Sequence, residues 1–437
     1  MAQKTQRSSK SRRPRAARPT AAPQPRRKRL LLLVTPGTYR AEAFMEAAQS
    51  LDVDVVRALD LPPQLANEWD VPLKTDFASI ESATNAIVEY AQEHPLDAVV
   101  AVDDSATLLA ARAAAALGLP HNPPEAAEAA RDKGIMRELM SAGGAPCPVF
   151  RRFHLTDDPR EIARKASFPC VVKPLRLSGS RGVIRANTPE DLEAAFLRTK
   201  RMLLNDGYPE DKTDILIEDF IPGVEVALEG LLTDGELRTL ALFDKPDPLD
   251  GPFFEETIYV TPSRLPDEAQ AAISAAVAVA AKSIGLRDGP VHAELRVNAQ
   301  GPWMLEIAGR SIGGLCSTVL EFGAGMRLEE ILLRHALGME TPTLDPAGAA
   351  GVMMIPIPRA GILHGVEGIE RACATPHVTG VEITARLRSP IIPLPEGASY
   401  LGFIFARADD PATAEAALRT AHAELRFDIR PMLTIVR

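Results

Sequence analysis

The segment between residues 291 and 310 constrains this chain most, because its alternating polar and apolar residues predict a β-hairpin. A three-residue loop in this hairpin would pair Asn298 with Pro302 and would place Glu294 directly opposite Glu306. Two carboxylates that face each other across a hairpin repel unless a cation lies between them. Hard oxygen ligands of this kind suit Mg²⁺. The simpler alternative is an amphipathic hairpin whose charged residues face water.

Cationic residues suited to phosphate binding occur near this hairpin and in an earlier segment. Arg310, four residues after Glu306, offers a planar donor fork for a phosphate or carboxylate. Lys173 ends an apolar run that begins at Phe168, and a loop of small residues follows it. Backbone N–H groups in such a loop can approach phosphate oxygens closely. The loop residues that would do so, unless they form a plain turn, are Ser178, Gly179, Ser180 and Gly182.

A strand, a bend and a second strand are predicted at residues 215–229. The bend at Pro222 and Gly223 would expose backbone polar groups to the edge of an adenine ring. Glu218 and Glu225 would then meet the adenine amine and the ribose hydroxyls. Two apolar residues between these carboxylates complete the expected nucleotide contact, Phe220 and Ile221.

In order and spacing these motifs resemble those of the ATP-grasp ligases. Within that superfamily the chain is most similar to the L-amino acid ligases that make dipeptides, the bacilysin-synthetase type, over about residues 30–435. The motifs that carry the resemblance are Arg131–Met140, Val172–Pro174 with its Ser/Gly loop, Ile217–Glu225, His292-x-Glu294 and Glu306–Arg310. The resemblance implies ATP and Mg²⁺ as cofactors, with Mn²⁺ as the alternative ion. The implied roles are phosphate contact for Lys133 and Lys173, adenine binding for Glu218, ribose binding for Glu225, metal binding for Glu294 and Glu306, and stabilisation of the acyl phosphate or tetrahedral intermediate for Arg310.

The resemblance also implies a substrate site in the loop before a long Ala-rich helix. In dipeptide-forming relatives a Glu in this loop holds a substrate's amino group, and Glu256 takes its place here, with Glu255 as the second choice. Relatives often have His three residues later, where this chain has Tyr259, so the identity of the acceptor stays open. Gly313 and Gly314 either offer backbone N–H groups to a carboxylate or begin a helix.

A chain of 437 residues is too long for one domain and suggests about three. Alternating strands and helices predict an N-terminal, Rossmann-like α/β domain at 30–122, of the kind that precedes ATP-grasp. The ATP-grasp domain is expected at 123–340 with a small lobe at about 146–220, and a β-rich closing domain at 350–437. The expected fold class is therefore α/β and α+β multidomain.

The local patterns predict helices and a lid around these motifs. Asp103 and Asp104 follow a predicted strand at 96–102, where they would either cap the next helix or contact a substrate. A Pro/Asp/Gly-rich loop at 244–256 suits a lid. Helices are expected at 41–50, 106–117, 123–142, 188–201, 266–284 and 411–425.

Composition narrows the remaining classes of function. No apolar run approaches the ~20 residues of a membrane-spanning helix. The four cysteines show no Cys-x-x-Cys spacing, which predicts reduced thiols in a cytoplasmic protein. Residues 1–29 hold eleven Lys/Arg and no acid, whereas residues 30–437 hold 38 basic and 58 acidic residues. We expect a disordered basic tail, the one part that would touch nucleic acid, and a homodimer would be common for the superfamily.

The sequence therefore predicts an ATP- and Mg²⁺-dependent ligase that activates a carboxylate as an acyl phosphate and joins it to an amine, with amino acids as both substrates. Lys173 and Arg310 are the expected catalytic residues. One alternative is an ATP-grasp ligase or carboxylase with a different acid or amine. The second is a nucleotide-binding protein without turnover, which would have no use for paired metal carboxylates.

Overall fold

The computed structural model describes residues 26–38, 40–61, 73–322, 325–341 and 348–432. Of the basic tail expected at 1–29, residues 1–25 lie outside this description, as does the end of the C-terminal domain beyond 432. The folded part begins slightly before the predicted boundary at residue 30. Arg26 donates to both oxygens of Asp97 at 2.8 and 3.0 Å, and Arg29 starts the first strand.

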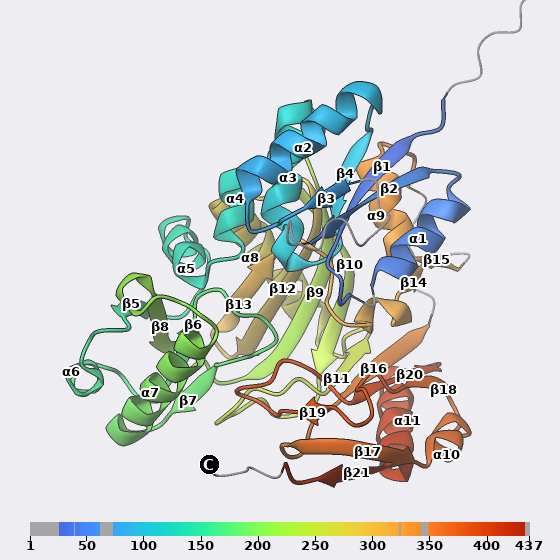
Figure 1. The fold of residues 1–437 in the computed structure, drawn as a ribbon. Helices are drawn as coiled ribbons and strands as arrows, with labels where there is room; N and C mark the ends of the chain where they lie inside the picture. Colours follow the sequence, from blue (N-terminus) through green and yellow to red (C-terminus); the bar gives the residue numbers. More distant parts are fainter. Residues whose placement is uncertain (1–25, 39, 62–72, 323–324, 342–347, 433–437) are drawn as a thin grey trace, which may run out of the picture.

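The N-terminal part is an α/β layer, drawn in blue in Figure 1. Its four parallel strands have the order β3-β2-β1-β4. Leu30 to Leu33 of β1 are fully buried, because helices cover both faces of a parallel sheet. The predicted helices are confirmed, but β3 and α2 were not anticipated. The elements are β1 (Arg29–Val34), α1 (Ala41–Ser50), β2 (Asp54–Asp60), β3 (Leu73–Thr75), α2 (Ile80–Glu93), β4 (Ala98–Ala101), a 3₁₀ turn η2 (Asp104–Ala106) and α3 (Thr107–Leu117).

The predicted helix at 123–142 is two helices in the structure, α4 (Pro124–Ala129) and α5 (Lys133–Ala142). The prediction missed an N-cap. The carboxylate of Asp132 accepts hydrogen bonds from two backbone N–H groups at the start of α5. This break puts Lys133 in the first turn of a helix, where its backbone N–H donates to the carbonyl oxygen of Leu175 at 3.0 Å.

The small lobe has its own antiparallel sheet, with the order β5-β8-β6-β7. Helix α7 covers it, and the predicted start at Thr188 is confirmed, because Thr188 and Asp191 cap the helix reciprocally. The elements are β5 (Phe150–His154), α6 (Pro159–Ala163), β6 (Cys170–Pro174), β7 (Ile184–Ala186), α7 (Pro189–Asn205), a 3₁₀ turn η3 (Glu210–Lys212) and β8 (Asp214–Asp219).

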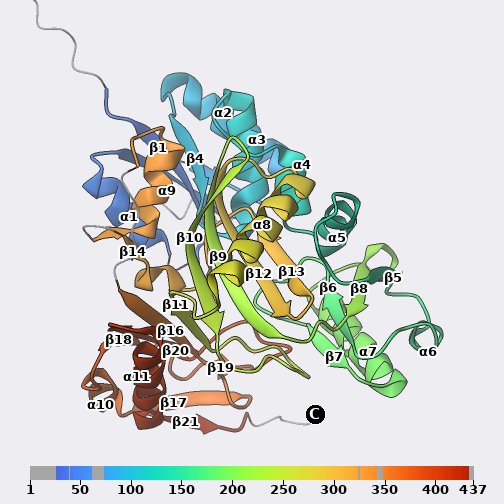
Figure 2. The ribbon, with the colours of Figure 1, turned by 180° about the vertical axis from the view of Figure 1, so that it is seen from behind.

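A large sheet of eight strands has the order β13-β12-β9-β10-β11-β16-β20-β18. Helix α8 packs on its back, as Figure 2 shows. Three strands of the C-terminal part, β16, β18 and β20, belong to this sheet. Its strand β16 pairs with β11, with Val260 opposite Gly351, and so extends the ATP-grasp sheet. The elements are β9 (Val224–Thr233), β10 (Glu236–Lys245), β11 (Ile258–Thr261), α8 (Asp267–Ile284), β12 (Gly289–Asn298), β13 (Gly301–Ala308), β16 (Ala349–Ile355), β18 (Val378–Glu382) and β20 (Gly402–Ala408).

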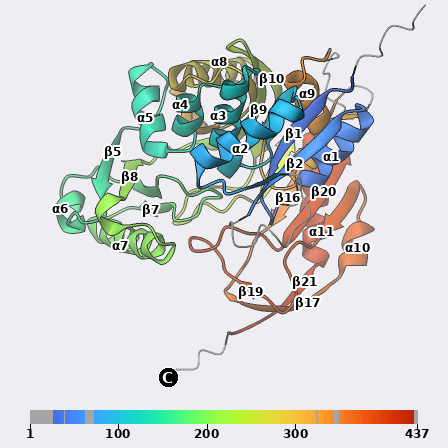
Figure 3. The ribbon, with the colours of Figure 1, turned by 45° about the horizontal axis from the view of Figure 1, so that its top comes forward.

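The remaining C-terminal elements pack against this extended sheet. Helix α11 covers β16 and β20, and a small sheet with the order β19-β17-β21 lies beside it. Figure 3 shows the small lobe and this C-terminal part as separate masses around the middle of the large sheet. None of the described helices is both long and apolar enough to cross a bilayer. The elements are η4 (Cys316–Val319), β14 (Glu321–Phe322), β15 (Met326–Arg327), α9 (Leu328–Ala336), β17 (Gly361–Glu367), α10 (Ile369–Cys373), β19 (Pro390–Ile391), α11 (Pro411–Glu424) and β21 (Arg426–Arg430).

The predicted hairpin is formed by β12 and β13, but its turn differs from the expected one. Asn298 pairs with Gly301 rather than with Pro302, so the loop has two residues instead of three. A β-bulge next to Glu294 inserts one extra residue on β13. The bulge compensates for the shorter loop, and Glu294 lies directly opposite Glu306 as predicted.

Candidate functional site

A cavity of about 270 Å³ lies between the small lobe, the face of the large sheet and a C-terminal loop. The structure brings every residue of the predicted site to its wall except Gly182 and Glu255. Gly182 packs against the ring of Pro174 at a φ of 73°, where a Cβ would come within 3.0 Å of that ring. Glu255 accepts a backbone hydrogen bond from Ile357, and burial raises the pKa of this carboxyl group. Glu256 is therefore the carboxylate of this pair that faces the cavity.

The two hairpin carboxylates face the cavity with cations on either side. Lys133 Nζ lies 3.1 Å from Glu306 Oε1 and donates to the carbonyl oxygen of Leu177 at 2.9 Å. Glu294 is largely buried, yet Lys245 and a neighbouring His hold its pKa well below the usual range. Glu294 therefore offers anionic oxygens, the ligand type that Mg²⁺ prefers, and the carboxylate of Glu306 faces it across the hairpin. In their residue types and their facing arrangement, the hairpin carboxylates fit a divalent cation.

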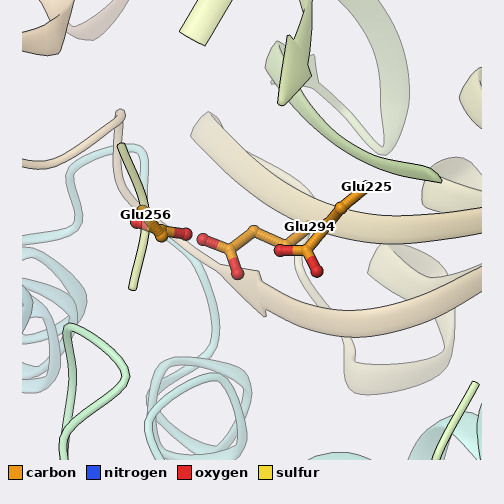
Figure 4. Close-up of side chains that lie close together, drawn as sticks. All are labelled: Glu225, Glu256 and Glu294. Atoms are coloured by element: carbon orange, nitrogen blue, oxygen red, sulfur yellow. The ribbon is translucent and has the colours of Figure 1, made fainter. Parts of the chain in front are cut away.

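Lys245 at the end of β10 is the main site residue that the sequence prediction missed. Its ammonium nitrogen lies 2.5 Å from Glu256, 3.0 Å from Glu225 and 3.5 Å from Glu294. These three carboxylates offer oxygens within 4.8 Å of one another, and Figure 4 shows those of Glu256 and Glu294 pointing together. Burial and Glu294 raise the pKa of Glu256 to about 7. The sequence did offer a signal for Lys245: like Lys173, it is a lysine at or near the end of an apolar strand.

The carboxylate expected to bind adenine has two protein partners already. Lys173 Nζ lies 2.5 Å from one oxygen of Glu218, and Arg137 Nε lies 2.9 Å from the other. Although burial disfavours the charged form, these two cations lower the pKa of Glu218. Arg137 stands four residues after Lys133 on α5, which places both side chains on one helix face. Glu218 thus holds Lys173 in place, and the adjoining residues 219–221 line the cavity.

Arg296 connects the loop at 244–256, which was predicted to be a lid, to the segment before the bend at Pro222 and Gly223, which was predicted to meet adenine. Its guanidinium donates to Glu225 at 3.1 Å, to the carbonyl oxygen of Ile221 at 3.1 Å and to the carbonyl oxygen of Leu249. It also lies 4.9 Å from the ring centroid of Phe220. Because Leu249 belongs to the loop between β10 and β11, this loop is docked on the site rather than turned away from it.

The Ser/Gly loop is held by the C-terminal part of the chain. Gly182 N–H donates to the carbonyl oxygen of Pro395 at 2.9 Å, and Arg181 donates to that of Glu396 at 2.7 Å. The Glu396 carboxylate also receives a bidentate pair from Arg198 of α7 at 2.6 and 2.9 Å. The C-terminal part therefore covers the loop expected to contact phosphates, which fits the closing role predicted for it.

Arg310 lies at the junction with the N-terminal layer. It donates to the carbonyl oxygen of Ser311 at 2.9 Å, and its Nε lies 3.7 Å from Asp104. Asp103 accepts from the hydroxyls of Thr35 and Thr38 and makes no side-chain cap to the following turn. The alternative of helix capping is therefore wrong for Asp103, while Asp104 stays beside a predicted catalytic residue.

Comparison with known proteins places the chain in a family. Residues 45–121 match the ATP-grasp N-terminal domain, 166–319 the ATP-grasp domain, and 353–430 the L-amino acid ligase C-terminal domain 2. The structure is similar to an L-amino acid ligase from Bacillus licheniformis, with a TM-score of 0.79 and 27% identity, covering 93% of this chain and all of that one.

Two curated relatives illustrate the sequence similarity. An uncharacterized protein y4rH from Sinorhizobium fredii is 23% identical, over 94% of this chain and 85% of its own length. Alanine–anticapsin ligase from Bacillus subtilis is 27% identical, over 58% of this chain and 56% of its own length. The latter alignment thus spans about half of that enzyme. The domain matches show that this chain is built of an ATP-grasp N-terminal domain, an ATP-grasp domain and a C-terminal domain of the L-amino acid ligase type.

Proposed function

We propose that this protein is an ATP-dependent carboxylate–amine ligase that joins two amino acids. The observation that carries the proposal is the convergence of Glu294, Glu306, Lys133, Lys173 and Arg310 on one cavity. A nucleotide-binding protein without turnover would have no use for two facing metal carboxylates beside two lysines. The names of the relatives, L-amino acid ligase and alanine–anticapsin ligase, support the same class of reaction.

The first half-reaction would transfer a phosphoryl group. A carboxylate oxygen of the donor attacks the γ-phosphorus of ATP, the bond to the β-phosphate oxygen breaks, and ADP leaves with the acyl phosphate formed. This transfer needs positioning and charge neutralisation more than covalent help from the protein. Lys173, fixed by Glu218, and Lys133, fixed by Leu177, supply two positive charges at set positions. Mg²⁺ held by Glu294 and Glu306 would neutralise phosphate charge when bound.

The second half-reaction would form the amide bond. The neutral amine nitrogen of the acceptor attacks the acyl carbon, the bond from this carbon to the phosphate oxygen breaks, and the departing phosphate takes the proton that the nitrogen loses. Arg310 can donate to the oxygen on which negative charge develops. An acyl phosphate hydrolyses readily, so water must be kept out. The loop held by Arg296 and the Ser/Gly loop held by Pro395 close two sides of the cavity for this purpose.

Glu256 is our choice for the group that receives a substrate's amino group. Lys245 lies 2.5 Å from one of its oxygens, and the side chain reaches the cavity wall. Tyr259, where dipeptide-forming relatives often have His, is 2% exposed, with its ring centroid 4.9 Å from Lys245 Nζ. This Tyr lines the pocket beside Glu256, so we expect it to influence which acceptor is used.

Phosphate release measured for pairs of amino acids, with products identified by mass spectrometry, tests the proposal. We expect release that requires ATP, a divalent cation and two amino acids, and a dipeptide in equal amount. Release with bicarbonate, or with a non-amino-acid carboxylate alone, would favour the carboxylase or another ligase. ATP binding without any phosphate release across a broad panel would contradict the proposal.

A further inference from the structure

Glu229 is a buried carboxylate in the middle of β9 that none of the site residues above accounts for. It is 1% exposed, and both of its oxygens have a partner. One oxygen lies 2.5 Å from Nδ1 of His292, and the other accepts the backbone N–H of Ile312 at 3.1 Å. These two partners belong to different parts of the site, because His292 is on the hairpin and Ile312 follows Arg310.

On the hairpin side, Glu229 sets the orientation of an imidazole ring. Glu229 and His292 are directly paired across β9 and β12. With Nδ1 directed at Glu229, the other ring nitrogen, Nε2, lies 3.5 Å from Oε1 of Glu294. A carboxylate that holds a His from behind fixes both the direction and the tautomer of its ring. The position of the Glu294 carboxylate is therefore set partly by Glu229.

On the other side, Glu229 anchors the segment that carries Arg310. Ile312 is two residues after Arg310, and the cavity wall includes Arg310, Ile312, Gly313 and Gly314. The hydrogen bond to the Ile312 N–H ties this segment to the centre of the large sheet. The Glu229 carboxylate thus contacts His292, which lies beside the expected metal ligand Glu294. It also contacts the segment that carries Arg310, the expected oxyanion donor.

We propose that Glu229 is a positioning residue that sets the distance between the metal carboxylate Glu294, through His292, and the catalytic Arg310, through Ile312. The inference rests on the proposed function for the roles of Glu294 and Arg310. Its basis is geometry: two hydrogen bonds from one side chain to two separate segments. A group that acts in this way should tolerate the loss of its charge better than a shortening of its side chain, because a shorter side chain cannot keep both hydrogen bonds.

Two substitutions of Glu229 separate the effect of side-chain length from that of charge. In Glu229→Gln the amide oxygen can accept from Ile312 and the amide NH₂ can donate to Nδ1 of His292, whose Nε2–H still faces Glu294. In Glu229→Asp the charge stays, but the side chain is one methylene shorter and leaves at least one hydrogen bond beyond its normal length. We therefore expect Glu229→Gln to stay close to the wild type and Glu229→Asp to lose function.

The readout is Mn²⁺ affinity, followed by electron paramagnetic resonance of free Mn²⁺ with a non-hydrolysable ATP analogue and no amino acids. We expect Glu229→Asp to weaken Mn²⁺ binding about 10–100-fold, the usual effect of losing a group that orients a metal ligand. The kcat for phosphate release should fall in parallel. Asp244→Asn, at a buried carboxylate of the same sheet bonded to Ser263 and Arg264, is the matched control and should leave Mn²⁺ affinity unchanged.

Thermal unfolding establishes that each variant is folded. If Glu229→Asp does not fold, His292→Asn takes its place, because its amide reaches Glu229 but not Glu294, and we expect the same loss of Mn²⁺ affinity. Wild-type affinity in both Glu229→Asp and His292→Asn, or a larger loss in Glu229→Gln than in Glu229→Asp, would overturn the positioning role. Glu306→Gln tests the metal site itself, so unchanged Mn²⁺ binding in that variant would contradict the proposed function independently.

Discussion

Replacing Lys245 with Met should destabilise the protein through the three carboxylates that it now neutralises. The side chain is 2% exposed and its ammonium nitrogen lies within 3.5 Å of Glu225, Glu256 and Glu294. Met has a similar volume, so the main change is the loss of charge. Removing one partner of a buried ion pair leaves an uncompensated charge and costs about 3–5 kcal/mol. We expect a loss of that order in the free energy of unfolding at pH 8, measured by urea denaturation.

A divalent cation should restore part of this loss. The carboxylate oxygens lie within 4.8 Å of one another, so the vacated position can accept Mg²⁺ or Mn²⁺ in place of the ammonium group. A ligand at ten times its Kd stabilises the folded state by about 1.4 kcal/mol. We therefore expect Lys245→Met to gain more stability from millimolar Mg²⁺ than the wild type does. The control is Lys282→Met on α8, an exposed position where the change should be within about 0.5 kcal/mol.

The pH dependence of this variant gives a second test. Burial raises the pKa of Glu256 to about 7, and Lys245 opposes that rise. The folded state therefore binds this proton more tightly than the unfolded state, whose carboxyl titrates near ~4.3, and stability falls as pH rises between these values. Without Lys245 the fall extends to higher pH, so the gap between variant and wild type should be larger at pH 8 than at pH 6. An equal gap at both values, with no response to Mg²⁺, would refute the reasoning.

Four further outcomes are expected. Glu306→Gln should nearly abolish turnover with the fold intact, because it removes a metal-ligand charge at constant volume; near-normal activity at low Mg²⁺ would exclude Glu306 from the metal site. Arg310→Ala should lower kcat and kcat/KM together by roughly 10²–10³, and Arg310→Lys should rescue only part; collapse of ATP affinity in calorimetry with normal kcat would make Arg310 a nucleotide anchor. Deleting residues 2–25 should leave kcat unchanged, and a large loss would give this basic tail a catalytic role. Cys373, which is exposed, should react with a thiol reagent at neutral pH before Cys170, whose pKa burial raises to about 12; equal rates would contradict the packing.

Local spacing was sufficient to predict the elements that carry the site. Short-range patterns placed the helix after Thr188, the strand that carries Lys173 near its end and the hairpin with its two facing carboxylates. Each of these depends on residues close in sequence, such as a cap, an apolar run or a period of two. The break between α4 and α5 was missed because α4 ends at Ala129 and Asp132 caps α5 with no Gly or Pro between them.

The pairing of charges was not predictable in the same way, because it depends on contacts between distant elements. Arg137 and Glu218 are 81 residues apart in the chain, and their hydrogen bond forms only once α5 packs beside β8. Sequence reasoning placed Glu218 in the site but assigned its oxygens to a ligand, since it could not see the two cations that occupy them. As a consequence, both oxygens of Glu218 are paired within the protein, and the three residues that follow it line the cavity.

The hairpin shows why a correct site can follow from an incorrect turn. The prediction assumed a three-residue loop, and the chain has a two-residue loop with a bulge beside Glu294. A shift of one residue alone would have turned Glu306 to the opposite face of the sheet, away from Glu294. The inserted residue reverses that shift, so both carboxylates face the cavity despite the different turn. Leu305 is the extra residue, so its deletion should leave a regular ladder with Glu294 still opposite Glu306. We therefore expect this deletion variant to keep Mn²⁺ binding, and loss of Mn²⁺ binding in the folded variant would contradict the register argument.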